Sequence, residues 1–117
     1  MTRSAMMLGL GMVLAWTLPA SAACDDPPAP GIDWDNCDKS GADLKNVDLT
    51  GASMRHINLS GADLSGANLS VAKLMSANLK DAKLDGANLE GAHLSSAVWP
   101  DGGGCGWYSV GVCKKKE

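Results

Sequence analysis

The stretch of sequence that decides the fold is residues 61–94, which read GADLSGANLSVAKLMSANLKDAKLDGANLEGAHL. An alanine returns every five residues, and a leucine follows each alanine by two positions. The same period covers residues 42–101. The alanine position is held by Ala42, Val47, Ala52, Ile57, Ala62, Ala67, Ala72, Ala77, Ala82, Ala87, Ala92 and Ala97, and the leucine position by Leu44, Leu49, Met54, Leu59, Leu64, Leu69, Leu74, Leu79, Leu84, Leu89, Leu94 and Trp99. A repeat this regular largely determines the architecture.

A period of five fits neither an ordinary helix nor a straight strand. Five helical steps advance about 140° beyond a full turn, so the leucines would spiral around a helix instead of forming a stripe. In a strand, an odd spacing places successive leucines on opposite faces. Within one five-residue unit, or pentad, the alanine and the leucine can point the same way. The chain must therefore turn after each such pair, which predicts a square coil of about four pentads with alanine and leucine inside.

The residues at the expected corners agree with this coil. Glycine often lies two positions after the leucine, where a type II turn needs a positive φ. Asn46 and His56 hold the same position and tolerate that conformation better than most residues. Val71 does not, so we expect a different turn type at that corner. The position before the leucine is usually Asp or Asn, whose short side chains can hydrogen-bond to the nearby backbone.

The units AlaAspLeuSerGly at 62–66 and AlaAsnLeuGluGly at 87–91 resemble the pentapeptide-repeat family. The resemblance implies an all-β fold, a right-handed quadrilateral β-helix, which the twelve pentads would extend to about three coils. The chain has no phenylalanine, the residue usual at the centre of the repeat in this family, and leucine there makes the core slimmer. Lys73, Lys83 and His93 depart from the Asp/Asn position, but that position faces solvent.

Residues 1–22 are typical of a secretory signal peptide. Arg3 is followed by an apolar run at 6–18, which is short for a membrane span, and Ala20-Ser21-Ala22 is an A-x-A cleavage site. We therefore predict a periplasmic or secreted bacterial protein with no stable membrane span after cleavage. The alternatives are a retained anchor and a lipoprotein with Cys24 as the lipidated residue. Ser21 stands where the lipoprotein motif wants an aliphatic side chain.

Four cysteines remain after cleavage: Cys24, Cys37, Cys105 and Cys113. An even count in a small exported domain suggests disulfides, and three pairings are possible. Because the ends of a rod lie far apart, pairing within each end is favoured. A metal site is disfavoured because the spacings are long, no histidine lies near either pair, and no C-x₂-C is present.

The segments flanking the repeat are expected to cap it, because the terminal coil of a solenoid has unpaired backbone groups. Residues 23–41 form the predicted N-terminal cap, although Ile32 and Cys37 fall on the alanine register and Trp34 on the leucine register, so that the coil can begin near residue 32. Residues 102–117 form the C-terminal cap and a basic tail. This end of the chain resembles a W-x-D-G…C…S-x-G-x-C segment of some exported family members. We expect Trp99, Trp107 and Tyr108 to cover the last coil.

Two features of this C-terminal segment leave alternatives open. The loop between its cysteines could bind a partner instead of serving only as a cap. Lys114, Lys115 and Lys116 would ordinarily be solvated, and the alternative is an electrostatic contact with an anionic lipid or polymer.

Composition and residue types argue against several function classes. Removing the signal peptide moves the formal charge from −3 to about −4, and the repeat has no basic face, which argues against nucleic-acid binding. Some long acidic relatives resemble DNA and engage type II topoisomerases, but this chain is too short and too weakly charged for DNA mimicry. His56 and His93 are expected about two rungs apart, too far to share a metal. No nucleophile–base–orienter set is visible, so we predict no catalytic residue and no cofactor.

The remaining hypothesis is a non-catalytic scaffold or interaction module with an unknown protein or envelope partner. Residues twenty apart should stack on the same side of the coil, so one side collects most of the cationic groups. This predicted contact face consists of Arg55, His56, Lys73, Met75 and His93, with Met75 as an exposed apolar residue. The alternative is an accessory protein of an envelope enzyme, or a metal-binding protein. The oligomeric state stays open.

Overall fold

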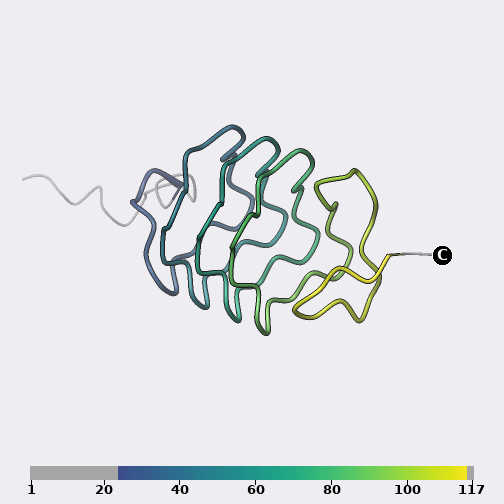
Figure 1. The fold of residues 1–117 in the computed structure, drawn as a ribbon. Coiled ribbons are helices and arrows are strands. Elements are labelled where there is room, and N and C mark those ends of the chain that lie inside the picture. Colours follow the sequence, from purple (N-terminus) through teal and green to yellow (C-terminus); the bar gives the residue numbers. More distant parts are fainter. Residues whose placement is uncertain (1–23, 116–117) are drawn as a thin grey trace, which may run out of the picture.

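The computed structural model describes residues 24–115 (Figure 1), so the predicted signal peptide lies outside the described residues. The chain winds into a four-sided coil in which residues twenty apart pair in parallel. Each side contributes a single bridge residue per coil, and no longer strand is formed within the coil. Side A contains Asp33, Ser53, Lys73 and His93, side B Asp38, Asn58, Asn78 and Val98, side C Asp43, Asp63 and Lys83, and side D Asp48, Asn68 and Asn88.

Backbone hydrogen bonds between successive coils fix this twenty-residue register. On side C, for example, the N–H of Leu64 donates to the C=O of Lys83 at 2.8 Å, and the N–H of Lys83 donates to the C=O of Ala62 at 2.9 Å. The pattern repeats on the other sides, so the backbone groups of an internal coil are satisfied by the coils before and after it. The five-residue period of the sequence thus becomes one side and one corner of a square.

Every corner from residue 31 to residue 96 has a positive φ. Seven corners are glycines, and the others are Asn36, Asn46, His56, Val71, Ser76, Asp81 and Ser96. The expectation of a different turn at Val71 is therefore wrong, because its φ is 50°. Two ladder bonds hold this corner in register: the N–H of Val71 donates to Glu90 at 2.8 Å, and the N–H of Gly51 donates to Ser70 at 2.9 Å. The ladder overrides the local preference of a branched residue.

The packing around Val71 also explains why the corner can close. A Cβ atom added at Gly91 would lie 2.9 Å from Cγ1 of Val71, so the glycine on the next coil leaves room for the valine side chain. That side chain is 53% exposed and projects away from the core. A positive φ at a β-branched residue is unfavourable, and the strain remains only because the surrounding ladder determines the backbone.

The polar position before the leucine acts as the sequence predicts. Oδ1 of Asn58, Asn68, Asn78 and Asn88, and of Asp33, Asp38, Asp43, Asp48 and Asp63, accepts the N–H two residues later at 2.9–3.2 Å. Such a bond satisfies a backbone donor next to the corner and contributes about 1 kcal/mol. The side chains that depart from Asp and Asn give up this bond.

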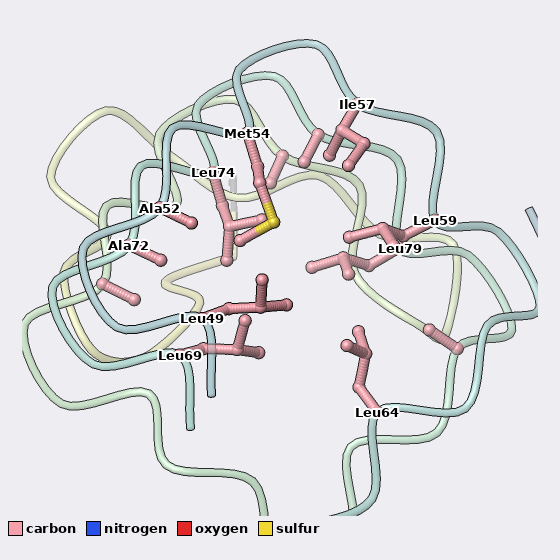
Figure 2. Packing of buried hydrophobic residues seen from close by; sticks show 14 of the residues in the cluster. Leu49, Ala52, Met54, Ile57, Leu59, Leu64, Leu69, Ala72, Leu74 and Leu79 are labelled. Carbon is pink, nitrogen blue, oxygen red and sulfur yellow. The ribbon is translucent and has the colours of Figure 1, made fainter. Parts of the chain in front are cut away.

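The interior is filled by the alanine and leucine positions, as the repeat predicts. Leu49, Leu59, Leu64, Leu69, Leu74, Leu79 and Leu94 are fully buried, as are Ala52, Ala62, Ala67, Ala72, Ala77, Ala92 and Ala97. Figure 2 shows the side chains stacking from coil to coil, with Leu49 over Leu69 and Leu59 over Leu79. Each buried leucine contributes roughly 2 kcal/mol through the removal of apolar surface from water.

The coil begins earlier than the alanine repeat, within the segment assigned to the N-terminal cap. Asp33 and Asp38 already pair with Ser53 and Asn58. Trp34 occupies the leucine register and is fully buried, and the ammonium of Lys39 lies 4.3 Å from the centre of its ring. The aromatic side chain therefore closes the core at this end, and the lysine covers the ring from outside.

At the other end the chain folds back across the last coil (Figure 1). Val98 pairs with Gly104 and His93 with Val110, both antiparallel. Trp99 is half-buried against the core, but Trp107 and Tyr108 are 79% and 85% exposed, so the expectation that they cover the last coil is wrong. The inward positions of this segment belong to the small residues Cys105 and Ser109, which turns the aromatic side chains outward. No helix within residues 24–115 has the length and apolarity to cross a bilayer.

The buried leucine position should be the least tolerant of charge. We expect Leu69→Asp to lower the free energy of unfolding by several kcal/mol, because it places an unpaired charge in a narrow apolar interior. The control is its neighbour: Asn68→Ser removes or weakens one exterior hydrogen bond and should cost about 1 kcal/mol or less. Thermal and denaturant unfolding of the two variants measures the difference, and equal destabilisation would contradict the inside–outside assignment.

Candidate interaction surface

Side A brings together the residues of the predicted contact face. Lys73 pairs with Ser53 on one coil and with His93 on the next, so the lysine and the imidazole are direct neighbours. His56 lies at the corner between sides A and B, and its N–H donates to the C=O of Met75 at 3.0 Å. Lys73, His93, His56 and Arg55 are exposed.

Met75 differs from its expected state. Its side chain is half-buried, not exposed, since the twenty-residue register places it between Arg55 and Ser95 on the flanking coils. The contact face therefore has less exposed apolar surface at its centre than the sequence suggested. Its remaining chemistry is polar and cationic.

Arg55 is neutralised by a carboxylate that sequence reasoning assigned to the N-terminal cap. Its Nη2 and Nε lie 2.7 and 3.1 Å from Oδ2 of Asp35, and its backbone N–H donates to Oδ1 at 2.8 Å. The Ser53 hydroxyl donates to the same Oδ1 at 2.7 Å. Asp35 and Arg55 are twenty residues apart, so the register that already placed Ile32, Trp34 and Cys37 also predicts that these two side chains lie on adjacent coils.

The environment of Asp35 shifts its titration. Partial burial by itself would raise the pKa, but the hydrogen bonds from the Arg55 guanidinium, the Ser53 hydroxyl and the Arg55 backbone outweigh it and lower the pKa of Asp35 to about 2. The same pairing raises the pKa of the Arg55 guanidinium. The pair fixes one coil to the next, and Arg55 is not available as a free cation.

Side A also departs from the Asp/Asn rule on three consecutive coils. The position before the leucine is Ser53, Lys73 and then His93, whereas sides B, C and D keep Asp or Asn except at Val98 and Lys83. The Lys73 ammonium has no acceptor atom, and the His93 imidazole accepts no backbone N–H within the described chain. At Lys73 and His93, side A therefore lacks the side-chain-to-backbone hydrogen bond that Asp and Asn make at this position on the other sides.

Pockets and metal-ligating clusters are the other features of residues 24–115 that bear on a site. Residues 24–115 enclose no cavity and hold no group of three His, Cys, Asp or Glu side chains arranged for a metal ion. Within this part of the chain, Lys73 takes part in no ion pair. The free cationic chemistry of side A thus comes from Lys73 and, when protonated, from His93 and His56.

The four cysteines are brought together in two pairs, one at each end. The Cα atoms of Cys24 and Cys37 are 5.5 Å apart, and those of Cys105 and Cys113 are 5.0 Å apart. Both distances lie in the range that a disulfide needs. The bonds themselves also require an oxidising compartment, and they belong to the proposal made below.

The family model for pentapeptide repeats matches residues 37–74 and 72–98 with 8 copies, and the chain belongs to this family. Pentapeptide repeat proteins form right-handed quadrilateral β-helices, and the four-sided coil described above is of that kind. A comparison with curated protein sequences gave no match.

Solved structures of the same family resemble this chain. The pentapeptide repeat protein Rfr23 from the cyanobacterium Cyanothece 51142 is 37% identical over 62% of this chain and 52% of its own, with a TM-score of 0.59. A pentapeptide repeat protein from the Arabidopsis thaliana thylakoid lumen is 30% identical over 57% of this chain and 50% of its own, with a TM-score of 0.43. The chain thus spans about half the length of these relatives.

The Asp35–Arg55 pair gives a prediction for the pH dependence of stability. Because the pKa of Asp35 is lower in the folded chain than its ordinary value of 3.8, its contribution is complete above about pH 5 and is lost as the pH falls toward 2. Asp35→Asn should therefore lower the free energy of unfolding by on the order of 1 kcal/mol at neutral pH, since Arg55 is half exposed to solvent. The difference from the unmodified chain should shrink as the pH falls through 2 and vanish only below that pH, where Asp35 is protonated in the folded chain as well.

Urea unfolding at a series of pH values measures this difference. Asp43→Asn is the matched control, since Asp43 is exposed, its contact with the Lys45 ammonium is long at 3.8 Å, and an asparagine can keep the bond that Oδ1 accepts from the Lys45 N–H. A loss at Asp35 that is equal at pH 7 and pH 2 would show that the ion pair is not its cause.

Proposed function

We propose that this chain is an exported, non-catalytic interaction module, a β-helix of about three coils that presents side A to an anionic partner in the cell envelope. The observation that carries the proposal is the departure of side A from the repeat. Ser53, Lys73 and His93 replace the Asp and Asn residues that hydrogen-bond to the backbone on the other sides. Replacing stabilising residues with less stabilising ones at successive positions of one side is typical of a surface selected for binding.

The structure of side A suits this role. Its backbone is held by ladder bonds, so that Lys73 and His93 occupy fixed positions on adjacent coils and lose little freedom when a partner binds. Lys73 carries a charge that no carboxylate in the described chain neutralises. We infer that the partner carries carboxylate or other anionic groups, and that salt weakens its binding.

Export is supported by the signal-like residues 1–22 and by the two cysteine pairs. Each pair lies at one end of the coil, where covalent closure would stabilise a cap over a small core. In this proposal the chain is cut after Ala22, and the periplasm or the exterior oxidises both pairs.

The export proposal predicts the covalent structure of the mature protein. Peptide mapping without reductant should join Cys24 to Cys37 and Cys105 to Cys113, and the first residue should be Ala23 or, after a one-residue shift, Cys24. Each bond should contribute about 2–3 kcal/mol, because each closes a loop of roughly ten residues. An uncut product with reduced thiols, or a link from Cys37 to Cys105, would contradict it.

The binding proposal predicts opposite effects on stability and on capture. Lys73→Asn restores the residue type of the repeat, so it should raise the free energy of unfolding by about 0.5–1 kcal/mol. The same change should abolish or strongly reduce capture of the partner from envelope extract, because it removes the free cation.

Lys83→Asn is the matched control, since Lys83 holds the same position of the repeat on side C. It should stabilise the chain by a similar amount and leave capture unchanged. If Lys73→Asn stabilises the chain but the partner is still captured, side A has a structural role only and is not the binding site. If a change in the loop at 106–112 abolishes capture instead, the C-terminal cap is the binding site.

A further inference from the structure

The large apolar side chains that the fold leaves exposed gather in one loop. Within residues 24–115, five large apolar or aromatic side chains are exposed, and four of them lie at 106–112, between Cys105 and Cys113. The four are Trp107 at 79%, Tyr108 at 85%, Val110 at 50% and Val112 at 57% exposure. Figure 1 shows this loop, in yellow, at the end of the molecule opposite the first coil. A cluster of exposed apolar side chains marks a contact surface.

The backbone holds these side chains outward. The N–H of Leu94 donates to the C=O of Ser109 at 2.8 Å, so the loop is bonded to the last coil at its middle. The N–H of Gly111 donates to the C=O of Ala92 at 2.8 Å and fixes the loop a second time. Ser109 is fully buried, and the residues on either side of it therefore point away from the core. The exposed side chains cannot turn inward unless these bonds break.

The loop lies along side A as its last rung. Val110 pairs antiparallel with His93, so its side chain projects from the outer face of side A. The Ser95 hydroxyl donates to the C=O of Trp107, which places the start of the loop at one corner of that side. A Cβ atom added at Gly111 would lie 3.7 Å from the backbone nitrogen of Gly91, which places the end of the loop at the other corner. The apolar side chains thus extend across the width of the coil.

The loop has few groups for the specific recognition of a sugar or a peptide. Apart from the polar edges of Trp107 and Tyr108, Ser109 is the one polar side chain between the two cysteines. Ser109 is buried, and its hydroxyl accepts the N–H of Lys114 at 2.9 Å. Residues 24–115 enclose no cavity, whereas a ligand site is usually concave and has several placed polar groups. Trp and Tyr side chains are instead enriched where an apolar phase meets water, as at a membrane surface.

Cations border the loop, and no acid lies within it. Residues 102–115 contain Lys114 and Lys115 and no Asp or Glu. The Lys115 ammonium contacts Asp101, whereas Lys114 is exposed and takes part in no ion pair within the described residues. Lys116 follows in the sequence and lies outside the described residues. Lysines beside an apolar surface attract the anionic headgroups of a lipid bilayer.

We propose that the loop 106–112 docks this chain on a membrane surface that contains anionic lipids. In the docked state Trp107 and Tyr108 lie at the boundary between headgroups and acyl chains, and Lys114 lies among the lipid phosphates. A few apolar side chains and one or two lysines each bind a bilayer weakly, so both contributions are needed and the contact is reversible. This proposal is separate from the binding proposed for side A, because Lys73 has no part in it. Export decides only which membrane the loop meets.

Co-sedimentation with vesicles tests the docking. The test uses the chain that begins at Ala23, with both cysteine pairs oxidised, and vesicles of phosphatidylcholine with or without an equal part of phosphatidylglycerol. We expect reversible binding to the anionic vesicles. Neutral vesicles or high salt should weaken that binding by at least about fivefold, because each lysine near an anionic surface contributes about this factor.

Paired substitutions assign the binding to the loop. Val110→Ser should weaken vesicle binding by at least about threefold, because it removes apolar surface that leaves water on docking. Val71→Ser changes a valine of nearly equal exposure on the coil and should leave binding unchanged. Lys114→Gln should weaken binding to anionic vesicles by about fivefold. Its control is Lys45→Gln, at an exposed lysine near the first coil. All four positions are exposed, and circular dichroism checks that each variant is folded.

Tryptophan fluorescence distinguishes insertion into the bilayer from adsorption on its surface. Trp34 is buried and Trp99 is half-buried, so the exposed Trp107 is the indole that should respond to lipid. Its emission should shift to shorter wavelength on anionic vesicles, and lipids brominated on the acyl chain should quench it. Trp107→Phe should still bind but should lose the shift.

Three results would overturn the proposal. The first is no binding to anionic vesicles, and the second is binding that Val110→Ser leaves intact. The third is binding without a change in the emission of Trp107, which would be electrostatic adsorption alone. If vesicles do not bind but Val110→Ser abolishes capture of an envelope protein or polysaccharide, the loop is a site for that partner and not for lipid. None of these results bears on side A, which is tested by capture with Lys73→Asn.

Discussion

The backbone ladder between residues twenty apart is the constraint on which the rest of this structure depends. Hydrogen bonds such as that from Leu64 to Lys83 fix the height and the phase of each coil. Once that register is set, each pentad must turn at the same point, and each alanine and leucine must point inward. Val71 shows the strength of the constraint, since a branched residue adopts a φ of 50° because the ladder bonds on both sides of its corner leave no other path.

A finite ladder has two ends, and the chain treats them differently. At the first coil a large aromatic side chain, Trp34, fills the position of a leucine and closes the core. At the last coil, the returning segment 103–115 pairs only with His93 on side A and Val98 on side B. Leu84 and Leu89 on the other two sides stay partly exposed. Because Leu84 and Leu89 are already half-buried, completing their burial would add only part of the roughly 3–6 kcal/mol that fully burying two leucines is worth.

The sequence predicted the coil because its period has only one geometric solution. It predicted the buried positions and the hydrogen bonds of Asp and Asn correctly, since both depend on contacts within one pentad or between identical pentads. It failed where the outcome depends on neighbours in space. Val71 was judged by its own propensity, while Trp107 and Tyr108 were judged by their hydrophobicity, although the small residues Cys105 and Ser109 take the inward positions. The neutralisation of Arg55 by Asp35 was missed because the register, although it was carried back to residue 32, was not used to pair the outward side chains of residues 35 and 55.

Function in such a fold must be sought where the repeat rule is broken without a structural reason. Three of the five positions in a pentad serve the core and the corner, and a fourth serves the backbone when it is Asp or Asn. A departure at that fourth position, such as Lys73 or His93, removes a hydrogen bond and gives nothing to the fold. A single departure is neutral drift at a tolerant site, as Lys83 can be. On side A the first departure, Ser53, has a structural role because its hydroxyl donates to Asp35, whereas Lys73 and His93 follow on the next two coils without one. Two such departures on adjacent coils of one side favour selection for contact over drift.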